Sequence, residues 1–575
     1  MLKYLKKYWF CCILAPLFML GEMSMDLLQP DMMATIVDEG VLASNFDVIF
    51  SVGIKMMLLV LFGGTCGVLC GVFAETAAHK FGNDVRKDMF DKIMNFSFEL
   101  TDRFTTGSLV TRITNDVSQV EQMVMMSVRS LVRCTAMFVG GIVMLYRQSP
   151  QFALVAACGL PFVIFFVVFF LKKVSPLYTI IQQKLDRLNC VMQENIAGAR
   201  VVKAYVKEDY ELENFSDANN SLCDTNLKAQ MTLAFMHPCV NIVLNMCVVG
   251  VLYVGGIGVQ TGSGITPGQV MAAITYLSLI LMRVIFMANI FQTFTRAAAS
   301  WKRIRRVLET ENTQKSSDVM PETHARGEIE FKNVSFHFPD TPDCPVLKNL
   351  SFKVNPGETA AIIGSTGSGK TSLVHLIPRF YDPTEGAVLV DGVDVREFPM
   401  KELREKIGIV QQKPELFSRT IKENICWGNE GAADEQVRHA AQTAQAEDFI
   451  LQTSDGYDTP VTEGGHSLSG GQKQRISIAR AVLKKPEIMI FDDSGSALDL
   501  KTEAALHSAL NDEFAGTTRI IVAQRIASVK EADKIFVLEN GQISAEGTHE
   551  ELLETSSVYR EICRSQLKKE AKLCG

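Results

Sequence analysis

Long apolar stretches crowd the first 300 residues, whereas the rest of the chain alternates short apolar runs with polar turns. A helix that spans a bilayer needs about 20 largely apolar residues. Six stretches qualify, at roughly 9–34, 48–77, 124–147, 151–172, 232–257 and 268–294. The later alternation is typical of a soluble α/β domain. The sequence therefore predicts an α-helical transmembrane domain over 1–312, a linker over 313–326 and an α/β domain over 327–575.

The connections between these spans differ strongly in length. The intervals 78–123 and 173–231 are long and charged, while 38–47, 148–150 and 258–267 are short. Six spans return the chain to its starting side, and the lysines within the first seven residues favour the cytoplasm. The first stretch lacks a small-residue cleavage site, so we interpret it as a retained span. We expect a multi-pass protein of a bacterial plasma membrane, with long helices, the N-terminus and the α/β domain on the cytoplasmic side.

Composition excludes two other classes of function. The net charge of −7 is modest, and no basic run is interleaved with aromatic residues, so we expect no nucleic-acid partner. Several of the 14 cysteines lie in predicted spans without zinc-type neighbours. Small apolar packing explains them better than disulfides or a metal site.

A phosphate-binding loop lies between an apolar strand and a helix in the second half of the chain. The apolar run 359–363 precedes it and 372–377 follows it, so its glycines lie where a strand turns tightly into a helix. Backbone N–H groups and the helix N-terminus favour phosphate, Lys370 can reach the outer phosphates, and the Thr371 hydroxyl can help hold Mg²⁺. The residues expected to contact the nucleotide are Gly364, Ser365, Thr366, Gly367, Ser368, Gly369, Lys370, Thr371 and Ser372.

A second motif narrows the class of nucleotide-binding protein. It consists of Leu468, Ser469, Gly470, Gly471 and Gln472, and it lies between the loop and an apolar strand, 488–491, that ends in Asp492. Together the two motifs resemble the ATP-binding cassette (ABC) family over the whole cassette. The resemblance implies a P-loop ABC nucleotide-binding domain with a helical subdomain, and ATP and Mg²⁺ as its ligands.

The family's other functional positions also have counterparts here. The resemblance implies that Phe338 stacks on adenine and that Gln412 belongs to the glutamine loop. Glu463 corresponds to the acidic coupling loop of exporters, and Asp499 to a loop that contacts the partner cassette. Thr371, Gln412 and Asp492 are the expected ligands of Mg²⁺.

A membrane domain fused to a cassette resembles the six-span ABC exporter half-transporter, whose helices exchange with those of a partner. Segments near 100–116 and 194–210 resemble the two intracellular coupling elements of that family. Solvated amphipathic helices are the alternative interpretation of these segments.

Two residues depart from the pattern of active cassettes. Asp493 stands where most active members have Glu, and its carboxylate should lie on the order of 1 Å farther from the attacking water. Gln524 stands where the family has a switch histidine, and glutamine cannot carry the charge of a protonated imidazole. We treat both as degenerate catalytic positions, and slow hydrolysis is the resulting hypothesis.

Cassettes of this family form head-to-tail dimers, with each ATP between one chain's loop and the other's signature. This chain's own site would be degenerate, while its intact signature, 468–472, would act on the ATP of the partner. A homodimer would carry the degenerate residues Asp493 and Gln524 at both of its ATP sites, so neither site would drive turnover. We therefore expect a heterodimer whose second ABC half-transporter carries Glu and His at these positions, as in bacterial multidrug-type exporters.

The transported substrate is less clear from the sequence. Glu22 and Asp26 share a helical face in the first span, and Arg283 lies in the sixth. The acids could select cationic amphiphiles, pair with Arg283 or lie near an aqueous boundary. We expect an exporter of small amphipathic compounds. A lipid or peptide exporter and a mainly regulatory ATP-binding subunit are the alternatives.

Overall fold

The chain divides into two units, and the division does not follow a single cut in the sequence. The computed structural model describes residues 1–573 apart from 263, 313, 315–318, 324 and 340. One unit comprises Met1–Met94 and Thr106–Thr310, and the other comprises Asn95–Thr105 and the residues from Glu311 onward. The predicted linker, 313–326, lies in part outside the described residues.

The first unit is built from helices, and the six predicted membrane spans are confirmed among the described residues. The spans run over Trp9–Val41, Phe46–Met94, Thr106–Gln148, Pro150–Ala197, Glu208–Gln260 and Pro267–Val284. The unit's elements are α1 (Leu2–Lys7), α2 (Trp9–Thr35), η1 (Ile36–Val41), α3 (Phe46–Met94), α5 (Thr106–Thr111), η2 (Arg112–Asp116), α6 (Val117–Met126), η3 (Ser127–Leu131), α7 (Val132–Gln148), α8 (Pro150–Ala197), α9 (Ala199–Ala204), α10 (Glu208–Ala234), α11 (Met236–Gln260) and α12 (Pro267–Glu309).

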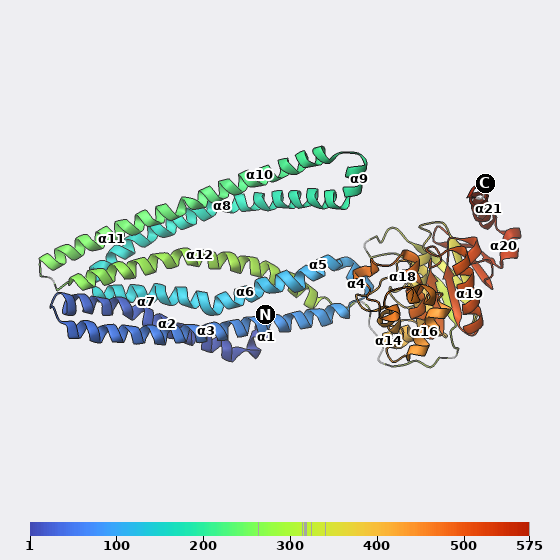
Figure 1. The fold of residues 1–575 in the computed structure, drawn as a ribbon, viewed down its shortest axis with the longest axis horizontal. Helices are drawn as coiled ribbons and strands as arrows, with labels where there is room; N and C mark the ends of the chain where they lie inside the picture. Colours follow the sequence, from blue (N-terminus) through green and yellow to red (C-terminus); the bar gives the residue numbers. More distant parts are fainter. Residues whose placement is uncertain (263, 313, 315–318, 324, 340, 574–575) are drawn as a thin grey trace. The chain divides into compact units, whose positions relative to one another are not determined.

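These helices are much longer than a bilayer is thick. Helix α3 has 49 residues, which corresponds to about 74 Å at the helical rise, against an apolar bilayer core of about 30 Å. Helices α10 and α11 run end to end alongside α8, and the three form an arm with α9 at its turn (Figure 1). The helices are therefore long enough to extend beyond the bilayer, as expected from the long charged intervals of the sequence.

A polar contact ties the first span to the last. The Asp38 carboxylate, in η1, accepts hydrogen bonds from the Thr266 hydroxyl (2.5 Å) and from the Gly268 N–H (2.8 Å), next to the start of α12. Thr266 also caps α12 through the Gln269 N–H. A Cβ on Gly268 would lie 2.4 Å from the Ala34 carbonyl oxygen, so this close approach requires glycine.

The second unit contains two sheets. The four-stranded sheet has the order β2-β1-β4-β5 and is antiparallel. The six-stranded sheet has the order β10-β9-β3-β8-β7-β6, and only β10 runs antiparallel to its neighbour. The strands are β1 (Ile329–Phe336), β2 (Leu347–Val354), β3 (Thr359–Gly364), β4 (Glu385–Val390), β5 (Val393–Asp394), β6 (Ile407–Val410), β7 (Ile488–Asp492), β8 (Thr518–Val522), β9 (Lys534–Glu539) and β10 (Gln542–Gly547).

Helices surround these sheets and bury the continuous apolar runs of the central strands. Every residue of β7 and β8 is buried, which is typical of parallel strands covered on both faces. The helices of this unit are α4 (Phe98–Phe104), α13 (Lys370–Leu376), α14 (Met400–Lys406), α15 (Ile421–Cys426), α16 (Asp434–Thr443), α17 (Glu447–Leu451), α18 (Gly470–Leu483), α19 (Leu500–Glu513), α20 (His549–Thr555) and α21 (Ser557–Leu573), with 3₁₀ turns η4 (Gly456–Asp458), η5 (Glu463–Gly465) and η6 (Ile526–Ser528). The predicted fold class, a domain of long apolar helices with an α/β domain, is confirmed.

This topology gathers the candidate site at one edge. The loop after β3, Asp492 at the end of β7, Gln524 after β8 and Gln412 after β6 all follow neighbouring parallel strands. Ligands of open α/β sheets bind outside the carboxyl ends of such strands.

Candidate functional site

The loop between β3 and α13 has the backbone of an anion cradle. Gly367 and Gly369 adopt φ angles of 83° and 99°, which glycine tolerates readily. A Cβ on Gly369 would approach the Val346 carbonyl oxygen to 3.1 Å. Two residues of α13, Thr371 and Ser372, stand at the helix N-terminus next to this loop.

Lys370 is folded back over this loop. Its ammonium group donates hydrogen bonds to the carbonyl oxygens of Gly364 (2.9 Å) and Ser365 (2.8 Å). Burial lowers the pKa of the Lys370 ammonium, and the nearby Asp493 and Asp492 carboxylates oppose that shift. The Ser368 hydroxyl is buried and has no hydrogen-bond partner among the described residues. A cation and an unpaired hydroxyl beside a glycine-rich loop fit a nucleotide's phosphates.

Asp492 and Thr371 supply oxygen atoms beside the loop. The Thr371 hydroxyl donates to the Asp492 carboxylate at 3.0 Å. Burial raises the pKa of Asp492, the Thr371 hydrogen bond opposes that rise, and the Asp493 charge adds to it. Carboxylate and hydroxyl oxygens are hard ligands, so this pair fits Mg²⁺ held together with phosphate.

The structure brings Gln412, Asp493 and Gln524 together on a single atom. Oδ2 of Asp493 accepts hydrogen bonds from Nε2 of Gln412 (3.1 Å) and from Nε2 of Gln524 (2.9 Å). Asp493 is only 7% exposed, and its backbone has a φ of 49°. One carboxylate oxygen of Asp493 is therefore hydrogen-bonded to a glutamine side chain from each of two neighbouring loops.

The segment around Gln524 is held from two sides. Gln566, on α21, donates to the Gln524 carbonyl oxygen (2.6 Å) and accepts from the Ile526 N–H (2.8 Å). Arg525 donates to the carbonyl oxygens of Ser496 (3.2 Å) and Leu498 (3.3 Å). Sequence reasoning missed Gln566, because a lone glutamine on a C-terminal helix carries no motif.

The predicted contact loop ends at Asp499, which caps α19. Its carboxylate accepts a hydrogen bond from the Thr502 N–H at 3.0 Å. A cavity of about 930 Å³ opens here, lined by residues that include Asp493, Ser496, Asp499, Gln524 and Gln566.

The signature residues form the exposed start of α18. Ser469 caps the helix by accepting from the Gln472 N–H, and the Gln472 side chain accepts from the Ser469 N–H at 2.8 Å. Leu468 is half-buried, and Gly470 is exposed. A Cβ on Gly471 would lie 2.9 Å from the Ala497 carbonyl oxygen, so glycine is required there. Among the described residues, no hydrogen bond joins this motif to the phosphate loop.

Two further predicted residues lie apart from the loop. Glu463 is exposed and begins η5. Phe338 is half-buried, and its ring meets Phe336 and Tyr381 edge-on at centroid distances of 5.1 and 5.5 Å. Both therefore remain candidates on sequence grounds, since no described contact links them to Lys370 or Asp493.

Comparison with known proteins identifies the two parts of the chain. Residues 12–284 match the model of the ABC transporter transmembrane region, and residues 347–496 match that of the ABC transporter family. The chain belongs to the ABC transporter family. It is an exporter half-transporter, a multi-pass membrane protein with a cytoplasmic ATP-binding domain, and its bacterial relatives support a plasma-membrane location.

Relatives of this ABC half-transporter match it over almost its whole length. It is 38% identical over 569 residues to the ABC transporter ATP-binding protein YfiB of Bacillus subtilis, covering 99% of this chain and 98% of YfiB. It is 32% identical over 534 residues to an ATP-dependent lipid A-core flippase of Syntrophus aciditrophicus, covering 93% and 88%. A bacterial Atm1-family ABC exporter with ATP bound superimposes with a TM-score of 0.80 at 26% identity, over 96% of this chain and 98% of the other.

Helix α4 belongs to the ATP-binding unit of this half-transporter and packs on two of its aromatic residues. The Phe98 ring stacks on Phe380 at a centroid distance of 4.1 Å. The Tyr381 hydroxyl donates to the Asp102 carboxylate at 2.6 Å. Burial raises the pKa of Tyr381, and the Asp102 hydrogen bond adds to that rise. Asp102, in the segment expected to be a coupling element, thus lies on the cassette surface.

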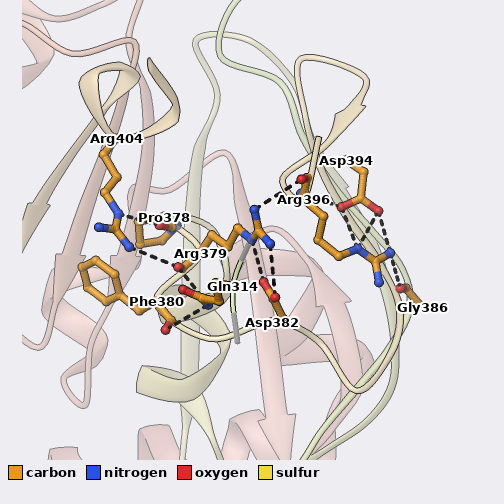
Figure 2. A network of polar contacts seen from close by, with 9 residues as sticks. All are labelled: Gln314, Pro378, Arg379, Phe380, Asp382, Gly386, Asp394, Arg396 and Arg404. Carbon is orange, nitrogen blue, oxygen red and sulfur yellow. Dashed lines mark hydrogen bonds and ion pairs between the residues drawn. The ribbon is translucent and has the colours of Figure 1, made fainter. Parts of the chain in front are cut away.

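A polar network fixes the chain that carries these aromatic residues (Figure 2). Arg379 is 4% exposed and binds both oxygens of Asp382, at 2.7 and 3.2 Å. The Arg404 guanidinium donates to the carbonyl oxygens of Pro378 (3.2 Å) and Arg379 (3.3 Å). The Gln314 side chain reaches the Arg379 carbonyl oxygen from another side, at 3.4 Å. This network holds Phe380 and Tyr381 in place for α4.

Charged residues in the spans form a different pairing from the one weighed from the sequence. Arg133, on α7, pairs with Glu22 (3.4 Å) and with Asp26 (3.8 Å) on α2. Sequence reasoning missed Arg133 as this partner. Among the described contacts, Arg283 makes no ion pair with either acid, although Asp26 attracts it electrostatically.

Proposed function

We propose that this half-transporter is the ATP-retaining subunit of a heterodimeric exporter of small amphipathic compounds. The main support for this proposal is the Asp493 carboxylate, whose Oδ2 already accepts hydrogen bonds from Gln412 and Gln524. A residue that activates water needs an oxygen aligned with that water. Asp493 offers a short side chain with one oxygen engaged, which supports slow hydrolysis at this chain's own site.

Nucleotide binding uses groups that this site retains. The loop N–H groups and the N-terminus of α13 bind phosphate, and Lys370 exchanges its loop carbonyl contacts for the outer phosphates. Thr371, Asp492 and Gln412 would hold Mg²⁺, which neutralises phosphate charge when bound. Binding thus survives where hydrolysis is weakened.

Turnover then depends on the second composite site. The exposed signature at the start of α18 presents the Ser469 hydroxyl and an N-terminal dipole, both suited to a γ-phosphate bound by the partner. ATP binding would close the cassettes and turn the membrane cavity outward, and hydrolysis at the partner's site would reset the pair.

Contact with the partner chain is expected at the α9 turn of the arm. Ile196, Val201, Tyr205 and Val206 are 74%, 60%, 73% and 81% exposed. Exposed apolar residues at a cytoplasmic turn favour docking on another protein surface. We propose that this turn, in the second coupling segment at 194–210, binds the partner's cassette.

A lipid exporter is the second candidate. The similarity to the lipid A-core flippase of Syntrophus aciditrophicus favours it. Transport assays with a labelled lipid and with a small amphipathic dye, run on the same vesicles, distinguish the two substrate classes.

The test of the divided labour uses the chain co-purified with its partner. Asp493→Asn should leave steady-state ATPase activity within about twofold, because this site contributes little turnover. Replacing the partner's expected catalytic Glu by Gln, or Ser469 by Ala in this chain, should reduce activity by on the order of a hundredfold. Both of these changes act on the ATP site of the partner, so their effects can be compared directly with that of Asp493→Asn at this chain's own site.

Two outcomes would contradict the proposal. One is loss of turnover in Asp493→Asn that equals the loss in the partner's variant. The other is a purified chain alone that hydrolyses ATP as fast as the pair, which would establish a self-sufficient homodimer.

A further inference from the structure

A cavity of about 700 Å³ lies within the membrane unit. Its walls come from α8 and α12, with contributions from α7 and α10, and they are mainly apolar. Representative lining residues are Phe138, Ile164, Leu171, Val284 and Phe291. Pockets of 300–1,000 Å³ with apolar walls suit drug-sized molecules.

The charged residues that line this cavity are cations. Lys172 on α8 and Arg283 on α12 both line it, and the described lining residues include no Asp or Glu. The electrostatic character of the cavity wall is therefore positive, in contrast to the acidic pair, Glu22 and Asp26, of the first span.

Arg283 is incompletely satisfied where it stands. Its Nε atom is buried and has no hydrogen-bond partner among the described residues. Among the described contacts, Glu22 and Asp26 form their ion pairs with Arg133, and Asp26 attracts Arg283 without forming an ion pair with it. A buried guanidinium N–H is costly without a hydrogen-bond acceptor, and intramembrane charges of this kind mark substrate pathways.

We propose that this cavity binds amphipathic anions, in which a carboxylate, sulfonate or phosphate group sits on an apolar body. Arg283 and Lys172 bind the acidic group, and the aromatic and aliphatic walls bind the body. A cationic amphiphile would instead place like charges together. The inference rests on the proposed export of amphipathic compounds and names their charge.

The experiment measures binding to the full transporter in nanodiscs of zwitterionic phosphatidylcholine, with empty nanodiscs subtracted. The probes are dansyl-aminoundecanoate, its uncharged methyl ester and a trimethylammonium analogue of the same chain length. The carboxylate should bind most tightly. Arg283→Gln and Lys172→Gln should each weaken it about tenfold, the effect of losing one charge-assisted hydrogen bond.

Two further variants control for folding and position. Arg283→Lys keeps the charge and should retain most of the affinity, which a general packing defect would not allow. Lys173→Gln changes the neighbouring lysine, which stands over the Phe169 ring and does not line the cavity, and it should leave affinity unchanged. ATP binding by every variant reports that the chain is folded.

The outcomes separate this inference from the proposed function. Equal affinity for acid and ester, tighter binding of the cation, or an unchanged affinity in Arg283→Gln overturns the anion site while leaving amphipathic export in place. If none of the three probes binds, the proposed amphipathic substrate fails together with the site. The division of ATPase labour is tested independently of both.

Discussion

Asp493 combines three features that bear on catalysis. It follows a buried strand, it adopts a φ of 49°, and its Oδ2 accepts from two amide side chains. A positive φ is uncommon for a residue other than glycine and is found at functional turns. The backbone of Asp493 therefore has a conformation found at functional sites. Its side chain, however, is short, and one of its carboxylate oxygens already accepts two hydrogen bonds.

Restoring the two side chains tests this interpretation. Asp493→Glu with Gln524→His lengthens the carboxylate, removes one of its amide donors and supplies an ionisable ring. ATPase activity of the purified chain should rise on the order of tenfold or more, because general-base catalysis contributes a large factor. Asp493→Asn with Gln524→His is the matched control and should stay low.

An unchanged rate in the first double variant would mean that these side chains do not limit the site. Phosphate release measured under saturating ATP distinguishes the two outcomes.

Much of the site was predictable at this scale, because motif spacing places residues on loops that adjacent strands bring together. Gln412, Asp493 and Gln524 could be named from the sequence. Their convergence on one oxygen could not, because it depends on side-chain directions. Arg133 and Gln566 were missed because their partners lie about a hundred and about forty residues away.

At the scale of elements, α21 restrains the segment after β8. Gln566 makes two hydrogen bonds to backbone on either side of Arg525. We expect Gln566→Ala to speed amide hydrogen exchange over residues 523–530 about thirtyfold, since it loses two hydrogen bonds of about 1 kcal/mol each. Mass spectrometry of the exchanged peptides measures it.

Two variants bracket that expectation. Gln566→Glu keeps the acceptor for the Ile526 N–H and loses the donor to Gln524, so its exchange should be intermediate. Ser565→Ala loses only a bond to its own helix, at Ile562, and should match the parent. Equal exchange in all variants would show that α21 does not restrain this segment.

Helix α4 offers a second test at this scale. Removing the ring in Phe98→Ala eliminates the stack on Phe380, which is worth about 1 kcal/mol beyond its buried area. Transport of a dye into inverted vesicles should fall several-fold, while ATP binding is retained. Phe90→Ala removes another exposed ring, on α3, and should leave transport unchanged.

Undiminished transport in Phe98→Ala would contradict a coupling role for α4.

Length and apolar content predicted the six spans well, because bilayer thickness leaves few alternatives. The docking of α4 on Phe380 and Tyr381 could not be predicted, since it joins residues far apart in the chain.

At the scale of the whole molecule, the chain is proposed to hold ATP without rapid turnover. After incubation with labelled ATP and Mg²⁺ and passage through a desalting column, the purified chain should carry nucleotide mainly as ATP. Lys370→Ala should carry little, because it loses the ammonium that reaches the outer phosphates. Recovery of bound ADP from the parent chain would contradict slow hydrolysis.

The second unit takes Asn95–Thr105 from the middle of the membrane half of the sequence. A cassette produced from residue 311 onward would lack this strip, and water would cover the Phe380 and Tyr381 rings that it shields. Chimaeras that graft this cassette onto another exporter should therefore work only when residues 95–105 travel with it, so the exchangeable module is a split one.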